Sequence, residues 1–164
     1  MTSLILYHAD CADGLGAALA ARLAQNDAEP MTFQAVRYGD SPPVLFGFDD
    51  IHILDFSYPA EILDAWDVRT TVTVLDHHKT AAHIADRPGC VFDLTKSGAV
   101  LAWEHYHPDQ EVPLLFRYIQ DRDLLTWALP GSREISAGLS ARPQNLEEWQ
   151  RIFAETETDN CDKL

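Results

Sequence analysis

Aspartate and histidine side chains gather at three points in the first half of the chain, each directly after a short apolar run. His8, Asp10 and Asp13 follow the run SLILY (3–7). Asp55 follows the run IHIL (51–54), and Asp76, His77 and His78 follow the run TVTVL (71–75). This mix of imidazole and carboxylate suits Mn²⁺, Mg²⁺ or Co²⁺ better than a thiolate zinc site. It predicts two cations sharing a bridging carboxylate, an arrangement that activates water and assists in-line phosphoryl displacement.

The apolar runs are typical of buried strands, and the segments between them are typical of helices. Further strands are predicted at 32–38 and 90–92, and helices at 97–106, 112–119 and 145–154. This alternation favours an α/β fold, with a mostly parallel, doubly wound sheet of about five strands flanked by helices and a helical C-terminal third. Ligands of such sheets bind outside the carboxyl ends of the strands, so the three groups are expected at one rim.

The 164 residues, 46% of them hydrophobic, predict a single domain over 1–155 followed by an acidic, flexible tail at 156–164. No apolar run approaches the roughly 20 residues that span a bilayer, and the N-terminus lacks the basic flank of a signal peptide. Three widely separated cysteines favour a reducing, cytoplasmic location. The formal charge of −14 argues against binding to long duplex nucleic acid but suits a protein that binds divalent cations.

Four segments resemble the motifs of the DHH phosphoesterase superfamily, which includes RecJ-like exonucleases, nano-RNases, cyclic-dinucleotide phosphodiesterases and family II pyrophosphatases. In chain order they are YHADCADGLGAA (7–18), ILDFSY (53–58), LDHHKT (75–80) and YIQDRDLLTW (118–127). The tripeptide DHH alone would be weak support, but four motifs in the family's order are specific. The resemblance covers most of the chain and implies a phosphohydrolase that uses two Mn²⁺ ions, with Mg²⁺ or Co²⁺ as substitutes.

Carried over residue by residue, the resemblance implies a role for each matching position. The implied metal ligands are His8, Asp13, Asp55 as the bridge, His77 and Asp121. Asp76 would orient the neighbouring histidines, and His78 would contact the scissile phosphate and donate a proton or hydrogen bond to it. A water held between the metals would be the nucleophile, so no covalent intermediate is expected.

Two positions leave alternatives open. Cys11 stands where many family members have an aspartate, so either Asp10 supplies the carboxylate, or Cys11 lies near one metal, or Cys11 is an inert buried residue. We favour Asp10 as a ligand because a hard cation prefers oxygen. Asp121 competes with Asp123, and because the two lie on different sides of a helix, only one can face the site. We favour Asp121 as the ligand and expect Asp123 to pair with an arginine or cap a turn.

Family members commonly carry a second domain with a GGGH-type segment that holds the substrate. This sequence has no GGGH, and its start at Met1 favours a stand-alone, single-domain member. The predicted substrate-binding residues are Lys79, Arg122, Ser97 and Gly98. They suit a small phosphorylated nucleotide or the end of a short oligonucleotide, and a homodimer is one way to complete the cleft. The alternatives are a pyrophosphatase or polyphosphatase, and a non-catalytic module that binds metal or nucleotide.

Overall fold

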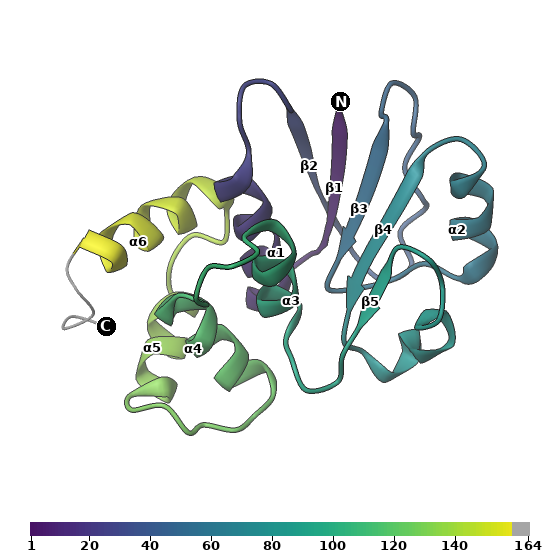
Figure 1. Ribbon diagram of the computed structural model, residues 1–164. Helices are drawn as coiled ribbons and strands as arrows, with labels where there is room; N and C mark the ends of the chain where they lie inside the picture. Colours follow the sequence, from purple (N-terminus) through teal and green to yellow (C-terminus); the bar gives the residue numbers. More distant parts are fainter. Residues whose placement is uncertain (159–164) are drawn as a thin grey trace.

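The computed structural model describes residues 1–158 and contains a five-stranded, all-parallel sheet flanked by helices (Figure 1). The strands are β1 (Ser3–His8), β2 (Met31–Val36), β3 (Asp50–Leu54), β4 (Thr71–Asp76) and β5 (Cys90–Phe92). Their spatial order is β2-β1-β3-β4-β5. The predicted α/β fold is confirmed, and the strand order changes direction between β1 and β3, where open sheets of this type bind ligands.

The helices cover both faces of the sheet and fill the C-terminal third of the described chain (Figure 1). They are α1 (Ala12–Ala24), α2 (Ala60–Asp67), the 3₁₀ helix η1 (Lys79–Ile84), α3 (Gly98–Tyr106), α4 (Leu114–Asp123), α5 (Ser132–Ser140) and α6 (Leu146–Thr158). No helix among residues 1–158 is long and apolar enough to cross a membrane.

Alternate side chains of the strands feed two hydrophobic cores, one on each face of the sheet. On one face Ile5, Leu54 and Leu75 pack with α1, α3, α4 and α6. On the other face the neighbouring strand residues, such as Leu6 and Ile53, pack with α2 and η1. This period of two along each strand places helices on both faces and leaves the strand ends open.

Small residues let α1 lie close to α3, and this close approach sets the geometry of the rim. Residues 17, 18, 20 and 21 are alanines with no exposed surface. A Cβ atom on Gly16 would lie 2.9 Å from Ala99 Cβ, so this position has no room for a side chain. The N-terminus of α3 is thereby held against the first turn of α1.

The sequence pattern does not predict α5, because its segment is mostly polar. The predicted end of the domain also lies too early. Helix α6 continues to Thr158, and Thr156 is buried, so the folded part passes the predicted boundary at residue 155. The rest of the predicted acidic tail, 159–164, lies outside the described residues.

Candidate metal centre

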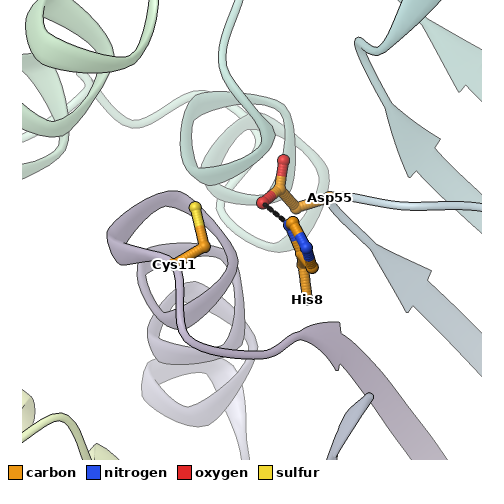
Figure 2. Close-up of side chains that lie close together, drawn as sticks. All are labelled: His8, Cys11 and Asp55. Atoms are coloured by element: carbon orange, nitrogen blue, oxygen red, sulfur yellow. Dashed lines mark ion pairs between the residues drawn. The ribbon is translucent and has the colours of Figure 1, made fainter. Parts of the chain in front are cut away.

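The three groups predicted from the sequence meet at the carboxyl ends of neighbouring strands. His8 is the last residue of β1, Asp55 directly follows β3, and Asp76 is the last residue of β4. Strands β1 and β3 are paired, as are β3 and β4, so the three ends lie side by side. Figure 2 shows His8 and Asp55 facing each other, with His8 Nδ1 and Asp55 Oδ2 3.4 Å apart. The predicted rim is therefore present.

Asp55 lies at the centre of this rim, with only 1% of its side chain exposed. Its backbone is in the left-handed region (φ 64°), a conformation that aspartate tolerates better than most residues. Its backbone N–H donates to the carbonyl of Leu75 at 2.9 Å. The two carboxylate oxygens face different histidines: Oδ2 faces His8, and Oδ1 lies 3.2 Å from His77 Nε2.

His77 places one ring nitrogen among three carboxylates. Its Nε2 atom lies 3.2 Å from Asp55, 3.3 Å from Asp13 and 3.4 Å from Asp123. An imidazole nitrogen carries at most one proton, so it cannot hydrogen-bond well to all three groups at once. The arrangement suits ligands that share a cation better than it suits an internal hydrogen-bond network.

The carboxylates of this cluster repel one another when no cation is present. Burial, followed by the charge of Asp55, raises the pKa of Asp13 to about 6. Burial and the charge of Asp13 likewise raise the pKa of Asp123 to about 6. Burial lowers the pKa of His77, but its contacts with Asp13 and Asp55 outweigh this effect and raise that pKa to about 10. His77 therefore holds a proton that a divalent cation can replace, and the oxygen and nitrogen donors of the cluster fit such cations.

Asp76 holds the loop that carries the two histidines. Its Oδ1 atom accepts hydrogen bonds from the backbone N–H groups of His77 (2.7 Å) and His78 (3.1 Å). The same oxygen lies 2.7 Å from His78 Nδ1, and this hydrogen bond, with the nearby carboxylate charges, raises the pKa of His78 despite partial burial. Asp76 thus fixes the orientation of a half-buried His78 ring. Its predicted orienting role fits this geometry.

Asp13 connects the cluster to the N-terminus of α3. The backbone N–H groups of Gly98 and Ala99 donate to its two carboxylate oxygens at 2.6 and 2.9 Å. The first amides of a helix attract an anion, and here a buried carboxylate from α1 takes that place.

Ser97 and Gly98, which were predicted to bind substrate, use their backbone N–H groups for hydrogen bonds within the protein. The N–H of Gly98 is used by Asp13, and the N–H of Ser97 donates to Gln120 Oε1 at 3.0 Å. Ser97 is fully buried, and its hydroxyl accepts a hydrogen bond from the N–H of Val100. Both N–H groups are therefore occupied by protein acceptors, and that of Gly98 holds the carboxylate of Asp13 in the cluster.

The structure places Cys11, and not the favoured Asp10, beside the cluster. Asp10 has a left-handed backbone (φ 56°), and its side chain is 70% exposed and paired with Arg37 at 2.7 Å. The turn at Asp10 brings the next residue, Cys11, into the cluster. Ligand atoms of His8, Cys11 and Asp55 all lie within 4.8 Å of one another (Figure 2).

Of the two competing aspartates, the structure places Asp123, and not the favoured Asp121, at the cluster. Asp121 is buried and caps the loop after α4, accepting hydrogen bonds from the Thr126 hydroxyl (2.6 Å) and the N–H groups of Ala128 (2.8 Å) and Leu129 (3.1 Å). Burial raises the pKa of Asp121, but the interaction with the Ser132 hydroxyl, together with these bonds, outweighs burial and lowers that pKa. Asp123, which was expected to pair with an arginine or cap a turn, faces Asp13 and His77 instead.

We expect two neighbouring alanine variants to separate these roles. Asp121→Ala leaves buried amides without an acceptor and should lower the free energy of unfolding by about 1–3 kcal/mol, as measured by urea denaturation. Asp123→Ala should change stability little without metal but weaken Mn²⁺ binding, as measured by calorimetry. Loss of Mn²⁺ binding in a fully folded Asp121→Ala protein would contradict this assignment.

The remaining predicted substrate residues lie beside the cluster. Lys79 is exposed and begins η1 directly after His78. Arg122 precedes Asp123 and donates to the hydroxyl of Ser140 at 3.2 Å. Their contact with a substrate stays a prediction.

Sequence reasoning missed Tyr38, an aromatic residue at the same rim. Its side chain is 60% exposed, and its ring centroid lies 4.9 Å from that of His8 and 6.5 Å from that of His78. The available signal was its place just after β2, whose carboxyl end adjoins that of β1. An exposed aromatic ring there offers a surface on which a base can stack.

Comparison with known proteins matches this chain to a viral protein. The chain is 29% identical over 175 aligned residues to an uncharacterized protein of Acanthamoeba polyphaga mimivirus. The alignment covers 96% of this chain and 42% of the viral protein, so the chain spans less than half the length of that relative. No family model matches the chain, and no solved structure matches it at a significant level.

Proposed function

We propose that this protein is a metal-dependent phosphoesterase of the DHH type that hydrolyses phosphate or phosphodiester bonds of small nucleotides or very short oligonucleotides. The observation that carries the proposal is the convergence of buried carboxylates and imidazoles on Asp55, at the point where the strand order changes direction. Such a crowded set of like charges is costly to fold unless cations neutralise it. Sites with two cations are typical of phosphoryl-transfer enzymes.

The geometry suggests which residues would hold each cation. Asp13, His77 and Asp123 form one group, and His8 lies in a second group on the other side of Asp55. Because the two oxygens of Asp55 face different groups, this residue fits the bridging role. Bound Mn²⁺ would lower the pKa of a water molecule and stabilise the charge that develops on the phosphoryl oxygens.

His78 is suited to contact the substrate. Its Nδ1 atom is occupied by Asp76, and its side chain is half-buried rather than enclosed. A ring held at one nitrogen can direct the other toward a phosphate oxygen and donate a hydrogen bond to it. Asp76 is accordingly a positioning residue in this proposal.

The size of the substrate follows from the charge of the protein. With 26 acidic and 12 basic residues, the surface repels a long polyanion, whereas one or two phosphates can be neutralised by bound cations. Tyr38 is placed to stack on a single base. A second copy of the chain would add a further wall to this open rim, and the free thiols of Cys11 and Cys90 suit a reducing compartment such as the cytoplasm.

A panel of substrates with Mn²⁺ tests the proposal. The panel contains pApA, short RNA ends, cyclic dinucleotides and pyrophosphate, and a double variant, Asp55→Ala with His77→Ala, serves as the control. We expect mononucleotide release that the double variant abolishes. Phosphate release from pyrophosphate alone would favour a pyrophosphatase, and Mn²⁺ binding without any turnover would favour a non-catalytic module.

A further inference from the structure

The candidate ligand groups at this rim differ in their chemistry. Two of them, Asp13 with His77 and Asp123 and Asp55 with His77 and His78, offer only oxygen and nitrogen atoms, whereas the group of His8, Cys11 and Asp55 contains a sulfur atom. We propose that Cys11 is a metal ligand, so that one cation position has a nitrogen, sulfur and oxygen donor set from His8, Cys11 and Asp55. This inference rests on the proposed two-cation site, and it makes the two positions chemically unequal.

The local backbone directs the sulfur into the cluster. Asp10 takes the left-handed conformation, and Cys11 returns to extended geometry (φ −129°, ψ 134°) as the residue that begins α1. Its side chain makes no capping hydrogen bond to the helix, although this is the position where side chains commonly cap. Its Sγ atom lies within 4.8 Å of ligand atoms of His8 and Asp55, and Figure 2 shows the three side chains close together.

Two buried atoms beside the sulfur have no hydrogen-bond partner. They are Asp55 Oδ2 and His8 Nδ1, which face each other at 3.4 Å, and Asp55 is almost completely buried. A buried polar atom without a partner costs free energy, and native proteins rarely leave one unless an ion or water completes it. A cation between the oxygen, the nitrogen and the sulfur would satisfy both atoms.

A thiolate ligand changes which metal this position prefers. Soft sulfur favours Co²⁺, Fe²⁺ or Zn²⁺, whereas Mg²⁺ is a hard cation that prefers oxygen ligands and binds sulfur poorly. The thiol loses its proton when it binds the metal. We therefore infer that, when Mg²⁺ is the only cation present, it fills the group of Asp13, His77 and Asp123. The position of Cys11 requires a transition metal.

Cobalt absorption spectroscopy tests this inference without reference to activity, because a Co²⁺–thiolate bond gives a charge-transfer band in the near ultraviolet. The reduced wild-type protein and single variants of each cysteine, Cys11→Ser, Cys90→Ser and Cys161→Ser, are titrated with Co²⁺. Asp10→Ala is the control for the adjacent position. The amount of bound Co²⁺ is measured in parallel by elemental analysis.

We expect the band in all proteins except Cys11→Ser. In that variant one Co²⁺ should bind at least about 10–100-fold more weakly. Loss of a residue that only hydrogen-bonds to a metal ligand already lowers metal affinity by that factor. A Cys11→Asp variant should bind two Co²⁺ without the band and should bind Mg²⁺ more tightly than the wild type does. Persistence of the band in Cys11→Ser, or bound Co²⁺ without a band in the wild type, would overturn the inference.

The same proteins separate this inference from the proposed function. Nucleotide hydrolysis without a thiolate band would leave the function standing and remove Cys11 from the ligand set. A thiolate band without hydrolysis of any substrate in the panel would keep the metal site and remove the enzymatic proposal. Failure of the wild type to bind Co²⁺ at all would overturn both.

Discussion

Asp55→Asn should abolish turnover and the stabilisation that Mn²⁺ gives to the fold. Asparagine keeps the shape of the side chain and tolerates the left-handed backbone at this position, so the variant removes charge with little change of geometry. Because Asp55 faces both ligand groups, its loss should weaken both cation positions. Loss of one hydrogen bond to a transition state lowers turnover by roughly 10²–10³-fold. We expect a larger fall for Asp55→Asn.

Thermal or urea unfolding with and without Mn²⁺ measures the second half of this prediction. A ligand at 100 times its dissociation constant stabilises a fold by about 2.7 kcal/mol, and this gain should be present in the wild type and nearly absent in Asp55→Asn. Asp10→Asn is the matched control, because Asp10 lies at the same rim but pairs with Arg37 in solvent. Wild-type stabilisation by Mn²⁺ in Asp55→Asn would contradict the bridging role.

Gly98→Ala should have the second large effect on stability and Mn²⁺ binding, because Asp55 occupies the space that a side chain at residue 98 would need. A Cβ atom at residue 98 would lie 2.6 Å from both Cβ and Oδ1 of Asp55. Because the Asp55 Cβ is one of the two clashing atoms, rotation of the carboxylate cannot relieve the contact, so the backbone of Asp55 or the start of α3 must shift and displace the carboxylate. Overpacking of this kind costs about 1–3 kcal/mol, and the displaced carboxylate should also lose Mn²⁺.

Gly138→Ala provides the matched control in α5. A Cβ atom there meets no other atom within 4 Å, so the substitution should stabilise the helix by about 0.5–1 kcal/mol. Urea denaturation and Mn²⁺ calorimetry on both variants give the comparison. Unchanged Mn²⁺ affinity in Gly98→Ala would show that the cluster does not depend on this close approach.

The sheet and the rim could be predicted because they depend on short-range patterns. Apolar runs of five or six residues identified β1 and β4, and parallel strands bring their carboxyl ends to one side. These patterns alone predict that His8, Asp55 and His77 lie together at one rim, as they do in the structure.

The errors share a different cause, since each depended on the conformation of one residue or on a distant partner. A single left-handed residue decided whether Asp10 or Cys11 enters the cluster, and aspartate gives only a weak signal for that conformation. The amides of Gly98 were taken by Asp13, a residue 85 positions away. Whether Asp121 or Asp123 faces the cluster depends on how α4 packs against the loop that follows it. Helical periodicity alone does not specify this packing.

Electron paramagnetic resonance of the Mn²⁺-loaded protein, with the bound metal counted by elemental analysis, tests the central claim most directly. Two Mn²⁺ ions that share the Asp55 carboxylate are expected to be magnetically coupled, and the wild type should hold two per chain. Asp55→Asn should lose the coupling and hold no more than one. A wild-type protein that binds no Mn²⁺, or only isolated ions with no coupling, would contradict the account.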